Sequence, residues 1–503
     1  LMVILFTLSI TAFGIYSVLH IPVGAVPDIT NNQVQVITVS ENLSTQDVEQ
    51  FITYPVELEM GNLPGVQEIR SISKFGLSVV TIVFDEDMGT YLPRQLISEK
   101  LKAASENIPE GFGTPEMGPI STGLGEIYQY ILDVEPEYKD KYSPMELRTI
   151  QDWVVKRQLT GIKGVVEVNT WGGFLKQYEV AIDPEKISSY GITLLDIYNA
   201  IKANNNLAGG AYIEKENFTY FIRGNGMIDS NTEIEKIRIK TTDGYPILLG
   251  DIADVKFGYA NRFGAITANA EGEKVMGQIM MLKDVNSKEV INAVIERVSE
   301  VQKSLPEGVF INPVLERSEL IDKTSFTIIE NLLLGCIIVI LIVVILLGNI
   351  RSALVIASII PLSLLFTISM MYLIGIDANL MSLGALDFGI IIDGAVIIVE
   401  FVALRISMAG KELASLSKSE SRILKDKITF EGSSKMINSA IFGQVIILIV
   451  LIPVFVLEGV EGKMFRPMAA AFSFAIIGAM IFGLTWIPAA SAMFLKAERK
   501  ENK

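Results

Sequence analysis

The chain has 503 residues, half of them hydrophobic, and a formal net charge of −15 at neutral pH. The apolar residues gather in blocks long enough to cross a bilayer, which indicates a polytopic membrane protein rather than a soluble one. The acidic balance argues against a nucleic-acid partner, and the single cysteine, Cys336, excludes a disulfide framework or a thiolate metal cluster.

Six apolar blocks predict six membrane spans, with one very long loop between the first and the second. The blocks lie at 2–20, 328–348, 352–374, 380–403, 436–457 and 468–494. Lys and Arg are most frequent in the segment 404–435, which the positive-inside rule places in the cytoplasm. Both ends of the sequence then face the cytoplasm, and residues 21–327 lie outside.

The first part of the external region predicts the order strand, helix, strand, strand, helix, strand over residues 34–135. Ser44 is a suitable cap for the first helix, and the second helix runs from about Tyr91 to Asn107. The segment GEIYQYILDV supplies the last strand. This order is the split, ferredoxin-like βαββαβ pattern.

A second copy of the pattern starts with a helix from Pro144 to Leu159 and is interrupted by an insert at about 171–261. The other elements expected in this copy are VVEVNT, KQYEVAID, FGAITANA, KVMGQIMML, a helix from Ser287 to Leu305, and VFINPVLE. The insert contains a helix near Leu194 to Asn204 and a Gly-rich hairpin, AGGAYIEKENFTYFIRGNG. This hairpin is either an arm that docks on a partner or an ordinary surface excursion, and both interpretations stay open.

Three carboxylates, Asp387, Asp393 and Glu400, stand inside the apolar segment LDFGIIIDGAVIIVEF. A charge at the centre of a bilayer costs about 2.5 to 3.5 kcal/mol, so these groups need a protein-lined or watery pocket. On one helix Asp393 and Glu400 share a face, while Asp387 lies about 120° round. Desolvation and a like-charged neighbour both favour the protonated form of a carboxyl group, so the pair is suited to loading and releasing protons. A structural role, with hydroxyl groups or a lysine as partners, is the weaker alternative because membrane carboxylates mark ion pathways.

The external region offers few metal ligands. Met276, Met280 and Met281 fall in an apolar strand, where core packing is a better explanation than binding of a soft metal ion. Glu126 starts the strand that carries Tyr128 and Tyr130, and it is a candidate ligand for a divalent cation, with a solvated strand residue as the alternative. No phosphate-binding loop is present, and no nucleophile, base and orienting group converge, so neither ATP hydrolysis nor another enzyme activity is expected.

Several long strings resemble a known family. They are VPDITNNQVQVITVS, PGVQEIRSISKFGLSVVTIVF, MGPISTGLGEIYQYIL, VNTWGGFLKQYEVAIDP, the acidic span and LEGVEGKMFRPMA. Through them nearly the whole chain resembles the amino-terminal half of the heavy-metal efflux pumps of the resistance-nodulation-division superfamily.

This resemblance implies a proton-driven antiporter that exports metal cations, with no cofactor beyond the transported cation and protons. Such pumps lie in the lipid of the bacterial inner membrane with their large loop in the periplasm. They work as homotrimers with a periplasmic adaptor and an outer-membrane channel. The implied parts are a first span at 1–20, porter subdomains at 21–120 and at 121–170 with 262–327, a docking subdomain at 171–261, and spans two to six at 328–503.

The family motif of the divalent-metal subgroups falls on Asp387, Asp393 and Glu400, so all three carry over as a proton relay. Zinc, cobalt, cadmium or nickel is therefore expected rather than copper or silver. Phe401 departs from the motif, which has Asn there. The chain is also about half as long as the family's pumps, so the matching carboxy-terminal half is expected as a partner, and the lack of an initiator Met indicates a start inside a longer sequence. Two alternatives are efflux of organic molecules and a non-transporting subunit that needs a separate second half.

Overall fold

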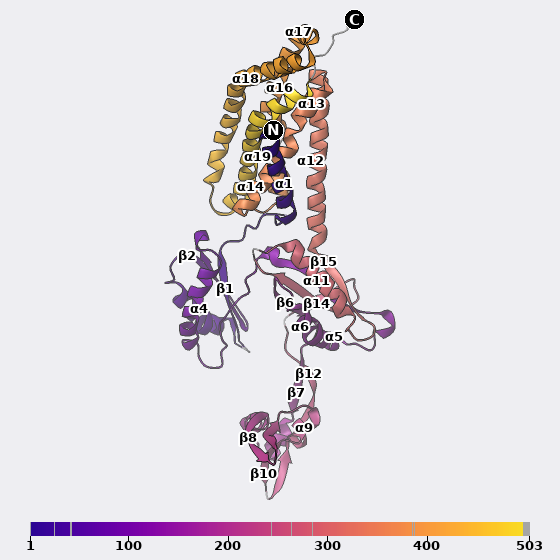
Figure 1. The fold of residues 1–503 in the computed structure, drawn as a ribbon. Helices are drawn as coiled ribbons and strands as arrows, with labels where there is room; N and C mark the ends of the chain where they lie inside the picture. The colour runs from indigo at the N-terminus through magenta and orange to yellow at the C-terminus, as the bar shows by residue number, and fades with distance from the viewer. Residues whose placement is uncertain are drawn as a thin grey trace.

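The structure is a computed structural model that describes residues 2–24, 26–40, 43–242, 244–262, 264–283, 285–384, 386 and 388–495. A bundle of long helices forms one end of the molecule, and the strand-rich region between α1 and α12 projects from it (Figure 1). Two lobes lie next to the bundle, and a third, smaller unit lies at the far end (Figure 1). The combination of long apolar helices and a sheet-rich region agrees with the predicted fold class.

Five helical segments among the described residues are long and apolar enough to cross a membrane. They are α1 (Met2–His20), α12 (Arg317–Leu347), α13 with α14 (Ile350–Ala357 and Ile359–Ile374), α18 (Lys418–Phe455) and α19 (Gly459–Phe494). The predicted span at 380–403 corresponds to a short helix, α15 (Leu380–Gly384), followed by α16 (Phe388–Met408). Because α16 also carries Asp393, Glu400 and Arg405, its assignment as a sixth span stays a prediction.

Two boundaries differ from the sequence prediction. Helix α12 begins at Arg317 rather than near 328, because β15 (Val309–Glu316) runs into it without a loop. The segment predicted as the loop 404–435 is largely helical, since it contains α17 (Gly410–Ser415) and the first turns of α18. Ser417 begins α18 with a capping box, in which its hydroxyl group and the Glu420 side chain each bond to the other's backbone N–H.

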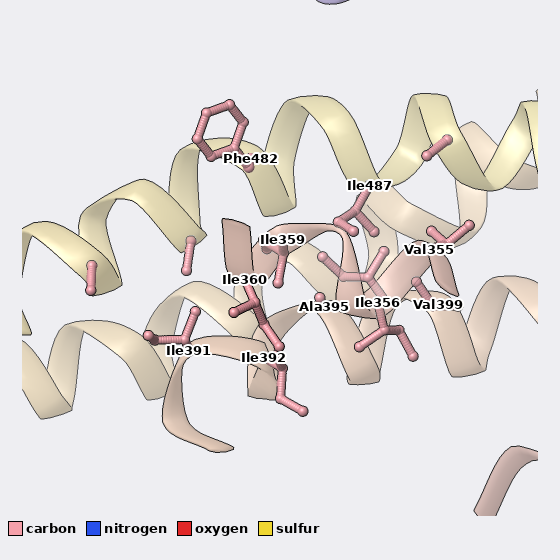
Figure 2. Close-up of a cluster of buried hydrophobic side chains, with 14 of the residues drawn as sticks. Val355, Ile356, Ile359, Ile360, Ile391, Ile392, Ala395, Val399, Phe482 and Ile487 are labelled. Carbon is pink, nitrogen blue, oxygen red and sulfur yellow. The ribbon is translucent and has the colours of Figure 1, made fainter. Parts of the chain in front are cut away.

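The core of the bundle is formed by apolar side chains from α13, α14, α16 and α19, which converge in Figure 2. Helix α19 packs against α14, α16 and α18, and α1 packs against α14. Small residues let α19 approach closely: a Cβ atom at Gly478 would lie 2.9 Å from a ring carbon of Phe366. Helix α16 is thus fixed between α19 and α18.

The first lobe is a four-stranded antiparallel sheet in the order β2-β3-β1-β4. Its elements are β1 (Gln33–Val39), α2 (Thr45–Val48), α3 (Tyr54–Met60), β2 (Val66–Lys74), β3 (Leu77–Phe84), α4 (Tyr91–Glu106) and β4 (Glu116–Met117). This is the predicted ferredoxin-like order, and Ser44 caps α2 as expected. The identity of the last strand was predicted wrongly, because the two-residue β4 takes that place and GEIYQYILDV belongs to the next sheet.

The second lobe repeats the pattern with the strand order β6-β14-β5-β15. Its elements are β5 (Glu126–Val134), α5 (Pro144–Ile150), α6 (Lys156–Leu159), β6 (Val165–Gly172), β13 (Ile266–Thr267), β14 (Glu273–Met281), α11 (Ser287–Gln302) and β15. Strand β5 lies at the centre of this sheet, between β14 and β15, and is buried on both faces. A π-helical turn interrupts the first helix of each lobe, at Glu49–Thr53 and Gln151–Val155.

The insert leaves the second lobe through a two-stranded ladder of β7 (Lys176–Ile182) and β12 (Ala253–Tyr259). The segment KQYEVAID is therefore a strand, as predicted, but it pairs within the insert and not with the main sheet. The terminal unit has an isoleucine-rich core. Its elements are α7 (Pro184–Ser189), α8 (Leu194–Ala203), β8 (Asn206–Lys215), β9 (Phe218–Gly226), α9 (Asn231–Glu235), β10 (Arg238–Thr242), β11 (Tyr245–Leu248) and α10 (Leu249–Ile252).

Candidate ion-coupling site

Helix α16 carries two of the predicted relay carboxylates on one face. Asp393 and Glu400 are both exposed, and so are Ile397 and Leu404, at the spacing of one helical stripe. The opposite face is buried against the bundle core, with Ile391, Ile392, Ala395, Ile398, Val399, Val402 and Ile406. The side chains of Ile391, Ile392, Ala395 and Val399 point into that core in Figure 2. The structure therefore brings Asp393 and Glu400 to one uncovered side of the helix, as the spacing predicts.

Asp387, the third predicted relay carboxylate, lies outside the described residues. Phe388, the next residue, begins α16, and its ring lies close to α12, where a Cβ atom at Gly335 would be 2.5 Å from it. The position of the Asp387 carboxylate relative to Asp393 remains a prediction.

Phe401 stands where the motif has asparagine, at the end of α16 that leads to the basic segment. Its ring lies 6.0 Å from the guanidinium of Arg405 and 5.8 Å from the Lys435 ammonium, measured to the ring centroid. The ring also approaches Gly432 of α18, where a Cβ atom would be 3.5 Å from it. Phe401 thus packs between α16 and α18 and binds two cations by cation–π contacts.

Glu126, the predicted external ligand, is half-buried at the start of β5. The Gln129 side-chain amide donates to its Oε2 at 3.3 Å, and the Arg317 guanidinium contacts its main-chain carbonyl and the Leu124 carbonyl. Burial and then the charge of Glu316 raise the pKa of Tyr128 to about 12, so this neighbour stays protonated. No group of three or more His, Cys, Asp or Glu side chains that could hold a metal ion occurs in the described part of the chain. Glu126 as a ligand stays a prediction.

The three methionines of β14 divide between the core and its edge. Met281 is 7 % exposed and belongs to the core of the second lobe. Met276 and Met280 are half-buried, and the Asn169 amide donates to the Met280 sulfur at 3.3 Å. This arrangement favours packing over a soft-metal site.

Two basic residues join long helices of the bundle to the two lobes, and sequence reasoning missed both. Lys463 in the first turns of α19 forms an ion pair with Glu86 at 2.8 Å and also donates to the Thr30 carbonyl. The predicted spans at 436–457 and 468–494 leave Lys463 in the turn between them, but α19 already begins at Gly459. Arg317, at the first residue of α12, holds the loop before β5. Each lobe is therefore fastened to a different long helix.

A buried ion pair lies within the second lobe. The Lys274 ammonium, whose side chain is 9 % exposed, contacts Asp133 at 2.9 Å and Glu271 at 2.8 Å. Burial alone would raise the pKa of Asp133, but the hydrogen bonds from Lys274 and from the Val134 N–H outweigh it and lower this pKa. The same carboxylates raise the pKa of Lys274 against the effect of its burial. This pair holds β14 against β5.

Comparison with known proteins identifies the family to which the chain is similar. The model of the AcrB/AcrD/AcrF family matches residues 1–503. The chain is 45 % identical over 509 residues to the cobalt-zinc-cadmium resistance protein CzcA of Cupriavidus metallidurans, covering 100 % of this chain and 47 % of CzcA. It is 37 % identical over 530 residues to the nickel and cobalt resistance protein CnrA of the same organism, covering 100 % of this chain and 49 % of CnrA.

More distant relatives include a cation efflux protein and a heavy-metal efflux pump. The cation efflux system protein CusA of Escherichia coli is 33 % identical and is matched over 97 % of this chain and 46 % of CusA. A crystal structure of a heavy metal efflux pump superposes with a TM-score of 0.84 at 32 % identity, over 97 % of this chain and 47 % of the pump. The chain thus spans about half the length of the curated relatives that it matches.

Proposed function

Because this chain belongs to the AcrB/AcrD/AcrF family, we propose that it is the amino-terminal half of a proton-driven pump that exports heavy-metal cations. The heavy-metal resemblance drawn from the sequence is confirmed by relatives whose names refer to cobalt, zinc, cadmium and nickel. Those names favour a divalent cation as the cargo. A transporter is also the class expected for this family, rather than an enzyme.

The observation that carries the proposal is the uncovered carboxylate face of α16. Asp393 and Glu400 lie on the exposed stripe of a helix whose other faces pack in an apolar bundle. A carboxylate that faces hydrocarbon is strongly unfavourable, so Glu400 on this stripe requires either water or another polar element against it. A second half of the pump, with basic or hydroxyl side chains opposite the stripe, would supply that element.

The proposed mechanism couples the charge of these carboxylates to the position of α16. When Asp393 and Glu400 take up protons from the outside, their attraction to a basic partner is lost and the helix can shift. Such a shift is driven only if the two arrangements differ in proton affinity. Lys463 and Arg317 then transmit movement of α19 and α12 to the first and second lobes, because each joins a helix to one lobe.

The proposed assembly is a homotrimer that joins a periplasmic adaptor and an outer-membrane channel from the inner membrane. The terminal unit of the insert supports a docking role for the β8–β9 hairpin, whose aromatic side chains are exposed. Phe218, Tyr220 and Phe221 are 67 %, 56 % and 83 % exposed. Large exposed apolar side chains on a two-stranded arm are typical of a surface that another chain covers.

The proposal is tested with the complete pump in proteoliposomes, by following internal pH while a zinc gradient is applied. We expect zinc to drive proton movement, and Asp393→Asn to abolish it, since the amide cannot exchange a proton. Glu412→Gln on α17, which removes an exposed carboxylate outside the apolar stripe, is the control and should leave the flux unchanged. An Asp393→Asn pump that exchanges zinc for protons at the normal rate would refute the proposal.

A further inference from the structure

Helices α13 and α19 leave a groove between them at the end of the bundle that lies far from the two lobes (Figure 1). Its volume is about 490 Å³, and its lining includes Arg351, Leu354, Ser358, Trp486, Met493 and Phe494. The Trp486 indole N–H donates to the Ser358 hydroxyl group at 2.9 Å, which joins the two helices at the inner end. The groove, here called the α13/α19 groove, therefore runs about 10 Å along the helices, from Arg351 and Phe494 to Ser358 and Trp486.

Arg351 supplies the charge at the mouth of the groove. Asn349 caps α13 by accepting hydrogen bonds from the backbone N–H groups of Arg351 and Ser352, which fixes the position of Arg351 in the first turn. Arg351 is exposed, and its guanidinium forms neither an ion pair nor a hydrogen bond with any residue that the structure describes. A guanidinium presents a planar fork of donors that fits a phosphate group. The mouth is thus suited to a phosphate-bearing anion.

The walls of the groove are apolar. Leu354, Met493 and Phe494 line it, and each of these side chains is more than half exposed. Trp486 closes the inner end, and its indole is already bound to Ser358, so it presents only its apolar surface to a ligand. A small hydrophilic anion would leave these walls uncovered, whereas a hydrocarbon chain would cover them.

The order of the two chemistries along the groove is that of a phospholipid, with a charged head and then hydrocarbon. Arginine near the end of a membrane helix extends to the level of the headgroups. Basic pockets between membrane helices at the cytoplasmic surface bind anionic headgroups. The predicted topology places Arg351 at that surface, because it follows the second span.

We propose that the α13/α19 groove binds one anionic phospholipid. The phosphate group lies on Arg351, and an acyl chain runs along Leu354, Met493 and Phe494 towards Trp486. A zwitterionic lipid also has a phosphate group, but its ammonium group cancels the charge that Arg351 attracts. The site is separate from the proposed transport, so it holds or fails without reference to proton coupling.

Trp486 reports occupancy of the groove, because bromine atoms quench the fluorescence of an indole that they touch. The complete pump is placed in phosphatidylcholine vesicles that contain increasing fractions of phosphatidylglycerol or phosphatidylcholine with brominated acyl chains. Since the chain has two further tryptophans, the Trp486 signal is the difference between the pump and its Trp486→Phe variant. Free phosphate carries no bromine, so an ion bound in place of a lipid gives no quenching.

We expect an affinity for brominated phosphatidylglycerol about tenfold above that for brominated phosphatidylcholine, a factor that one hydrogen bond to a charged group supplies. Arg351→Gln should remove this preference, while quenching by brominated phosphatidylcholine shows that its groove is still formed. Arg422→Gln is the control, because Arg422 is an exposed arginine of α18 in the predicted cytoplasmic segment, and it should keep the preference.

Three results would overturn the proposal. Equal quenching by the two brominated lipids would show only ordinary contact with the bilayer. Absence of quenching by either lipid would show that a protein segment or a free ion occupies the groove. A preference for phosphatidylglycerol that persists in Arg351→Gln would show that the guanidinium does not bind the headgroup.

Discussion

At the scale of single residues, the relay carboxylates could be predicted and their surroundings could not. The seven-residue spacing of Asp393 and Glu400 is enough to place both on one face of α16, and the structure shows them on its exposed stripe. Gln444 had no such signal, because a glutamine in an apolar run shows neither its burial nor its neighbour. Only the packing of α18 on α16 brings its amide to Gly394. Lys463 and Arg317 were missed for the same reason, since their partners lie far away in the sequence.

Gly394 provides a direct test of that packing. We expect Gly394→Ala to destabilise the protein by about 1 to 3 kcal/mol, because the added methyl group would press on the buried Gln444 amide. Gly443→Ala is a matched control on the facing helix, since nothing lies within 4 Å of a Cβ atom at Gly443. The midpoint of thermal unfolding in detergent should fall for Gly394→Ala and should hold or rise for Gly443→Ala. Equal midpoints for the two variants would contradict the described contact.

Glu126 is predicted to help bind a divalent cation, and Glu126→Ala should then weaken zinc binding by about tenfold. Glu137→Ala, which removes an exposed carboxylate of the same lobe, is the control. Calorimetric titration of the purified protein with zinc measures both. The closeness of Arg317 opposes a cation at this position, so an unchanged affinity in Glu126→Ala would leave Glu126 as a structural residue.

The buried Lys274–Asp133 pair predicts a pH dependence in the second lobe. The pKa of Asp133 is lowered, so the pair stabilises the fold above the ordinary value of 3.8 and loses this effect as the pH falls through the lower folded value. The pKa of Lys274 is raised above 10.5, so its contribution is complete below that pH and is lost only in stronger alkali. At neutral pH, Asp133→Asn should therefore cost about 1 to 3 kcal/mol, because Lys274 is left buried with one carboxylate fewer.

Hydrogen exchange of the β5 and β14 amides at pH 7 measures that cost, and Asp140→Asn, an exposed position of the same lobe, is its control. Faster exchange in Asp133→Asn alone is expected, with the difference from the unsubstituted protein shrinking in acid below pH 3.8. Identical protection at pH 7 would show that the pair contributes nothing to this sheet.

At the scale of elements, most helices and strands of the external region follow from periodicity and capping, and the errors have identifiable causes. β4 has only two residues, Glu116–Met117, and two residues carry no alternation. The prediction therefore assigned β5 to the sheet of the first lobe instead of the second, although its strand character was predicted correctly. In the bundle, the start of α12 was placed too late because a charged first turn does not look like a membrane span, whereas the chain passes from β15 to helix without a break.

The β8–β9 hairpin is the element for which the sequence left two roles open, and its exposed aromatic residues favour docking. Phe221→Ser is expected to weaken self-association of the complete pump, because Phe221 is 83 % exposed and would be covered by a neighbouring copy. Tyr245→Ser is the control, since Tyr245 is 78 % exposed in the same unit but lies on the β10–β11 hairpin. Mass photometry of both variants at graded dilution reports the fraction of trimer. A trimer fraction in Phe221→Ser that equals the control would show that the hairpin is a surface excursion.

At the scale of the whole molecule, the chain matches about half the length of its relatives, and its helix bundle leaves one face of α16 uncovered. Its bundle buries the aliphatic faces of α13, α14, α16 and α19 together (Figure 2), but the stripe with Asp393 and Glu400 remains exposed. The relatives are about twice as long as this chain. A second half that covers the stripe accounts for both facts, and it would complete the relay.

The most direct test of this account is zinc and cobalt efflux from metal-sensitive cells. The chain is expressed alone or with a matching second half, and each case is compared with its Asp393→Asn version. The account predicts efflux only when both halves are present and Asp393 is intact. Efflux from this chain alone, or from the paired Asp393→Asn version at the normal rate, would contradict it.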